Sequence, residues 1–123
     1  MPAEPAVRVA LVTAPDKGTA SSLARTVVEE RLAACVNLLD GATSVYRWEG
    51  RVEEDAEVLM ICKTTPESLG ALAARILELH PYDTPEFVVL NPEWVEPRYA
   101  AWLAGAAAPG RGDTDASAEG APE

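Results

Sequence analysis

The sequence has few of the side chains that usually bind soft metal ions. Its 123 residues include one histidine and two cysteines. A zinc or copper centre draws three or four ligands from imidazole, thiolate and carboxylate groups, and softness and geometry then select the metal. The supply of imidazole and thiolate is therefore thin, and any such centre has to rely on carboxylates.

Motifs of catalysis and of membrane insertion are absent as well. The sequence contains no glycine-rich phosphate loop, nucleophile elbow or metal-hydrolase spacing, so we expect no enzymatic activity. No stretch approaches the roughly 18 continuous apolar residues of a membrane span. The first nine residues, MPAEPAVRV, lack the basic and apolar regions of a secretory signal. We therefore expect a cytoplasmic location and no membrane partner.

The two cysteines, Cys35 and Cys62, fall in apolar surroundings. Disulfides form in oxidising compartments, so without export we expect two free thiols and no disulfide. A buried, inert thiol is the favoured interpretation of each, with a role as ligand or redox group as the alternative.

Negative charge dominates the composition. The formal net charge is −10, of which the last nineteen residues contribute −3 and the remainder −7. Such a field repels nucleic acid and anionic membranes, and no stretch clusters lysine or arginine with aromatic residues. It attracts cations weakly, which agrees with a metal hypothesis without establishing one.

The apolar periodicity predicts four strands and three helices. Thr65 and Pro66 form a helix N-cap and first position, Pro81 ends that helix, and Gly41 marks a bulge within a strand. Glu49 and Gly50 form the turn of a long hairpin. The expected strands are 7–14, 35–48, 51–65 and 86–90, and the expected helices are 16–34, 66–79 and 98–105.

This order of elements predicts the fold. Right-handed crossovers in a βαββαβ chain place both long helices on one face of a sheet, which is a ferredoxin-like α+β sandwich, here with a long hairpin arm and a C-terminal helix. We expect residues 7–104 to form the domain, residues 1–6 to be flexible, and residues 105–123 to form a disordered acidic tail.

The strands are apolar on both faces, although helices can cover only one. In the first strand Val9 and Leu11 alternate with Ala10 and Val12, and all four are apolar. This pattern is typical of strands covered on both sides, so another copy of the chain is the natural cover. The residues that we expect at an oligomer interface are Val12, Tyr46, Trp48, Tyr99 and Trp102.

The stretch HPYDTPE, residues 80–86, allows two interpretations. His80, Asp83 and Glu86 are candidate metal ligands, together with Cys35. Alternatively the stretch is a stiff corner between a helix and a strand, which is the interpretation we favour. Such a corner can still line a cleft between subunits whose ligands complete a site. Lys63, which leaves a buried strand, is expected to pair with an acid such as Glu86.

Four segments together resemble the CutA divalent-cation tolerance family: ACVNLL (34–39), GATSVYRWEG (41–50), EVLMICKTT (57–65) and HPYDTPE (80–86). The resemblance covers residues 7 to 104. It implies a cytoplasmic homotrimer of ferredoxin-like subunits whose arms pair across subunits, linked to tolerance of copper and other divalent metals. Some copper-binding relatives carry a cysteine in the first strand and a His-His pair before the proline. This sequence has Val12 and Leu79 there, so only His80 remains of those three ligands.

Two functional hypotheses follow. The first is a homotrimer of metal-ion tolerance that binds Cu2+ or another divalent cation weakly or transiently, with no tightly bound cofactor. The second is a trimer similar to the PII signalling proteins, which the resemblance also suggests, binding a small molecule or a protein at clefts between subunits.

Overall fold

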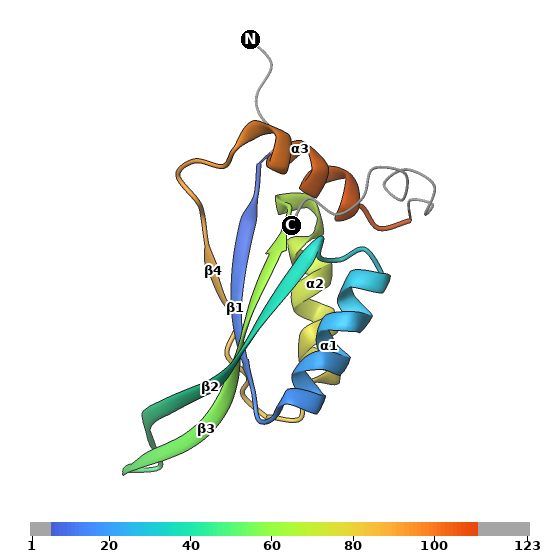
Figure 1. Ribbon diagram of the computed structural model, residues 1–123. Helices are drawn as coiled ribbons and strands as arrows, with labels where there is room; N and C mark the ends of the chain where they lie inside the picture. The colour runs from blue at the N-terminus through green and yellow to red at the C-terminus, as the bar shows by residue number, and fades with distance from the viewer. Residues whose placement is uncertain (1–5, 111–123) are drawn as a thin grey trace.

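A computed structural model describes residues 6–110 and has a four-stranded antiparallel sheet with helices packed on it (Figure 1). The strands lie in the order β2-β3-β1-β4. This arrangement confirms the predicted ferredoxin-like α+β fold. Its elements are β1 (Arg8–Ala14), α1 (Lys17–Glu29), β2 (Cys35–Trp48), β3 (Arg51–Thr64), α2 (Pro66–Leu79), β4 (Val88–Leu90) and α3 (Pro97–Ala106).

Local capping interactions set the ends of the two long helices. The hydroxyl of Thr65 accepts a hydrogen bond from the backbone nitrogen of Ser68 at 3.2 Å, so Thr65 is the predicted N-cap of α2. The helix ends at Leu79, and His80 is extended because the following Pro81 disfavours a helical conformation. Helix α1 ends at Glu29, five residues before the predicted end.

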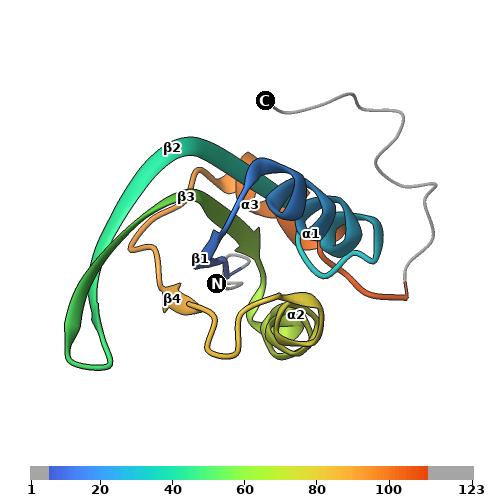
Figure 2. The same ribbon diagram turned by 90° about the horizontal axis from the view of Figure 1, so that it is seen from below.

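The main core lies between the sheet and helices α1 and α2, which share one side of the sheet (Figure 2). Val12 is 0% exposed in this core, so the prediction that it lies at an oligomer interface is wrong. Apolar residues on both faces of β1 do not reveal which face the helices take. The other buried residues of this cluster are Ala10, Ala14, Ala20, Leu23, Val27, Leu32, Ala33, Val58, Met60, Cys62, Leu72 and Ile76.

The opposite face of the sheet is also apolar, and we call it the open face. It consists of Val9, Leu11, Leu59, Ile61, Val88 and Leu90, which the strand register places on the same side. Helices α1 and α2 lie on the other side. The edge strand β4 is exposed at Val88 (47%) and Leu90 (49%), and it begins two residues later than predicted.

Beyond the body of the sheet, β2 and β3 continue as the hairpin arm, which we define as residues 42–57 (Figure 1). The register shifts between Leu39 and Ala42, where Gly41 has φ 84°, so the predicted bulge at Gly41 is confirmed. The turn at Glu49 (φ 51°) and Gly50 (φ 79°) places two successive residues in the left-handed region, as a tight hairpin turn requires.

Helix α3 packs at one end of the sheet over a second, smaller cluster (Figure 1). Tyr99 and Trp102 are half-buried against this cluster within their own chain. Ala107 is buried, and its carbonyl accepts a hydrogen bond from the Ser68 hydroxyl at 2.8 Å. The domain therefore extends past the predicted boundary at residue 104. Residues 1–5 of the expected flexible segment 1–6, and residues 111–123 of the expected tail 105–123, lie outside the described residues.

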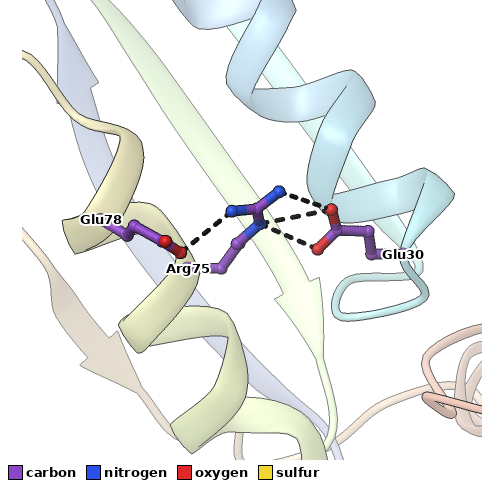
Figure 3. Close-up of polar contacts among 3 residues, drawn as sticks. All are labelled: Glu30, Arg75 and Glu78. Carbon is purple, nitrogen blue, oxygen red and sulfur yellow. Dashed lines mark hydrogen bonds and ion pairs between the residues drawn. The ribbon is translucent and has the colours of Figure 1, made fainter.

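An ionic network joins the two long helices on their outer surface. Arg75 of α2 lies between Glu30, just after α1, and Glu78 of its own helix (Figure 3). Its guanidinium contacts the Glu30 carboxylate at 2.8 and 3.0 Å and the Glu78 carboxylate at 2.9 Å. Because these groups are partly exposed, water and salt screen their attraction, and the network contributes little to stability.

We predict that the two cysteines differ sharply in reactivity. Burial raises the pKa of the Cys62 thiol from 9.0 to about 12, with a smaller contribution from Cys35. Iodoacetamide at pH 8 should therefore alkylate the half-buried Cys35 and spare Cys62 until the chain is unfolded, as mass spectrometry of the peptides will show. Stability should also fall as pH rises from about 9 to 12, because only the unfolded thiol ionises there. Alkylation of both thiols at similar rates in the native protein would contradict this.

Candidate functional site

The corner formed by residues 80–86 joins α2 to β4 and holds the only histidine of the chain. His80 is buried, with 7% of its surface exposed. Its Nδ1 accepts a hydrogen bond from the backbone nitrogen of Tyr82 at 3.1 Å. Its Nε2 lies 2.8 Å from the carbonyl oxygen of Thr13 in β1. A backbone N–H can only donate and a carbonyl can only accept, so the ring is neutral and carries its proton on Nε2.

The predicted metal ligands do not form a centre in the single chain. Both ring nitrogens of His80 are already occupied by backbone groups, and Asp83 and Glu86 are exposed. Cys35 lies beside the position of Val9 across the sheet, whereas His80 contacts Thr13. Val9 and Thr13 are four residues apart in β1, which is about 13 Å at the rise of a strand. Within residues 6–110, no three His, Cys, Asp or Glu side chains are grouped so that they could hold a metal ion.

Two tyrosine–carboxylate pairs lie at the base of the arm and along it. The Tyr82 hydroxyl donates to the Glu57 carboxylate at 2.7 Å, and the Tyr82 ring lies 4.7 Å from that of His80. Burial, followed by this hydrogen bond, raises the pKa of Tyr82. The Tyr46 hydroxyl donates to Asp55, which together with partial desolvation raises the pKa of Tyr46 to about 12. Both phenols therefore stay protonated donors at neutral pH.

Sequence reasoning missed Tyr82 and Glu57. They are 25 residues apart, and they come from a corner and a strand. The Tyr46–Asp55 pair does have a sequence signal. Acidic residues recur at 53, 55 and 57, on the same face of the hairpin as Tyr46, and neighbouring residues on one face of two paired strands can interact. No comparable pattern links the corner to β3.

The predicted pair between Lys63 and Glu86 does not form. Lys63 opposes Val9 at one end of β1, whereas Glu86 precedes Val88, which opposes Leu11 nearer the other end. The ammonium group of Lys63 instead lies 3.4 Å from the Tyr99 hydroxyl and 5.5 Å from the centre of its ring. This contact helps to hold α3 against the end of the sheet.

The predicted interface residues of the arm are accessible. Tyr46 is 41% exposed and Trp48 is 53% exposed, on the same face of the arm. Val45 and Val52 on the other face are exposed as well. The arm therefore presents apolar side chains on both of its faces.

We predict that nuclear magnetic resonance will find one tautomer for His80. The single histidine gives one pair of ring nitrogen signals, so no assignment is ambiguous. At pH 7 the long-range nitrogen–proton spectrum should show a protonated Nε2 and an unprotonated Nδ1, whereas the urea-unfolded chain should give the averaged signals of a ring that exchanges protons freely with water. A folded protein whose ring carries its proton on Nδ1 would contradict the two hydrogen bonds.

A helix that spans a membrane needs a certain length and apolar character. Within residues 6–110, none of the helices is long and apolar enough to cross a membrane.

Comparisons with known proteins agree on one family. The family model for the CutA1 divalent ion tolerance protein matches residues 8–106. The divalent-cation tolerance protein CutA of Thermus thermophilus is 46% identical over 95 residues, which span 77% of this chain and 92% of that protein.

Solved structures share the fold. CutA1 from Oryza sativa aligns with a TM-score of 0.78 at 41% identity, covering 81% of this chain and 92% of the other. A protein of Archaeoglobus fulgidus described as a periplasmic divalent cation tolerance protein aligns with a TM-score of 0.80 at 28% identity, covering 83% and 99%. With sequence and fold in agreement, the chain belongs to the CutA1 divalent ion tolerance protein family.

Proposed function

We propose that this protein acts in tolerance of divalent cations as a homotrimer that binds these cations weakly and transiently. The observation that carries the assembly is the open face of the sheet, and the trimer number follows the family resemblance. We keep the cytoplasm as the proposed location. It stays a prediction, because the Archaeoglobus fulgidus relative is described as periplasmic.

The open face supports assembly on energetic grounds. Full burial of an apolar side chain of this size contributes about 1.5–3 kcal/mol relative to full exposure, and the partly exposed side chains of the open face gain a fraction of this when they are covered. Several such side chains lie together across β1, β3 and β4. The edge of β4 and the strands of the arm also carry backbone groups that can pair with another chain. A neighbouring copy supplies both the apolar cover and the strand partner.

Weak binding of cations follows from the ligands available. The formal charge of −10 attracts cations, and Asp83 and Glu86 expose carboxylates at the corner. His80 becomes a ligand only by giving up one of its two backbone hydrogen bonds, which leaves a buried polar group unsatisfied. We therefore propose that the corner carboxylates bind Cu2+ or another divalent cation, with further ligands from neighbouring subunits or water.

We predict that a charge on the open face will separate the subunits. Ile61→Asp places a carboxylate in the centre of that face, where assembly would have to bury it without a partner. Sedimentation velocity should then show a folded lone chain. The matched control is Leu77→Asp on the exposed surface of α2, which should keep the size of the unmodified protein. If Ile61→Asp leaves the size unchanged, this face is not the interface.

We also predict that the corner carboxylates carry most of the cation binding. In calorimetric titrations with Cu2+, the double variant Asp83→Asn/Glu86→Gln should bind at least about tenfold more weakly, a loss of about 1.4 kcal/mol. The control Glu29→Gln/Glu67→Gln removes the same charge from exposed helical positions and should bind like the unmodified protein. Equal isotherms for the two double variants would exclude the corner as the binding site. Parallel titrations with Zn2+ and Mg2+ will rank the metals.

A further inference from the structure

The arm leaves the body of the sheet at a bulge that forms a natural pivot. Leu39 pairs with Leu59 on the body side, and Ala42 pairs with Glu57 on the arm side. Two residues of β2, Asp40 and Gly41, therefore lie opposite a single residue of β3. A bulge interrupts the ladder of hydrogen bonds and bends the strand, so the ladder alone fixes the direction of the arm poorly here.

One side-chain hydrogen bond crosses this pivot. Tyr82 belongs to the corner after α2, and its hydroxyl donates to Glu57 at 2.7 Å. Glu57 is the first residue of β3 on the arm side of the bulge. Tyr82 is thus placed to hold the base of the arm from outside the hairpin.

Tyr82 is itself fixed to the central strand of the body. Its backbone nitrogen donates to Nδ1 of His80 at 3.1 Å, and Nε2 of His80 donates to the Thr13 carbonyl at 2.8 Å. Thr13 pairs with Leu59 on the body side of the bulge. Pro81 and Pro85 restrict the backbone of the corner further. A line of three hydrogen bonds therefore runs from β1 through the corner to the arm.

We propose that His80 and Tyr82 are positioning residues that fix the direction of the hairpin arm relative to the body of the sheet. This assignment gives the stiff HPYDTPE stretch a role that needs no metal. The phenol is suited to it, because its hydroxyl lies 2.7 Å from the Glu57 carboxylate and can donate a hydrogen bond across the bulge.

The length of the arm makes its direction important. Six residues of strand separate Ala42 from Trp48, about 20 Å, so a rotation of about 10° moves the tip by about 3.5 Å. That displacement approaches the spacing of about 4.8 Å between paired strands. If the arm pairs with a neighbouring subunit, a step that rests on the proposed function, an arm free to swing loses its register.

The test measures the direction of the arm by electron–electron distances between two nitroxide labels. One label is attached through Arg51→Cys at the arm turn, and the other through Ala74→Cys on the exposed surface of α2. Cys35 is replaced by serine, and the buried Cys62 is left in place. Labelled full-length chains are diluted with unlabelled chains so that each assembly carries one labelled copy.

Tyr82→Phe removes only the hydroxyl that crosses the pivot, and it should broaden and shift the distance distribution. The matched control is Tyr46→Phe, which removes the same group from the Asp55 pair that lies wholly within the arm. It should leave the distribution unchanged. A Tyr82→Phe distribution equal to that of the parent, or equal changes in both variants, would overturn the proposal.

Two further readouts separate positioning from other effects. If Tyr82→Phe lowers the melting temperature while the distances stay the same, Tyr82 is only a stabilising residue and the proposal is wrong. Sedimentation of the same samples reports assembly independently. If the protein sediments as a lone chain and Tyr82→Phe broadens the distances, positioning by Tyr82 is supported and the proposed trimer is contradicted. If the protein is assembled and Tyr82→Phe leaves the distances unchanged, assembly is supported and positioning by Tyr82 is contradicted.

Discussion

Two helices can cover only one face of a four-stranded sheet, and this constraint governs the whole molecule. The covered face carries Val12 and Met60 in the main core, while the open face carries Leu11 and Ile61, which are just as apolar. Exposed apolar area of this kind is unfavourable in water, and among residues 6–110 no strand pairs with the outer edge of β4 or with the edges of the arm. In the proposed trimer, a neighbouring copy covers the open face and resolves both problems together.

The corner after α2 connects this constraint to the arm. A buried imidazole needs a partner for each nitrogen, and His80 finds them in the backbone of Thr13 and Tyr82. The same arrangement orients the Tyr82 hydroxyl toward Glu57 at the base of the arm. The sequence suggests His80 as a metal ligand, but both of its ring nitrogens bind backbone groups. The proposed binding of cations therefore relies on exposed carboxylates and is weak.

Sequence signals predicted the features that depend on neighbouring residues. Thr65 and Pro66 begin α2, Pro81 ends it, and Gly41 marks the bulge, because each acts through local backbone geometry. Features that depend on distant contacts were missed or wrongly assigned. Val12 belongs to the core because α1 and α2 pack on the face of the sheet to which it points. Tyr82 and Glu57 are distant in sequence and come into contact only in the folded chain.

Sedimentation velocity of the unmodified full-length chain at micromolar concentration, with chelator present to remove bound metal, tests the central claim most directly. A single species with the mass of a trimer of the 13.1 kDa chain is the expected result. A folded, stable and monodisperse lone chain would contradict it, because the open face would then remain in water without a cover.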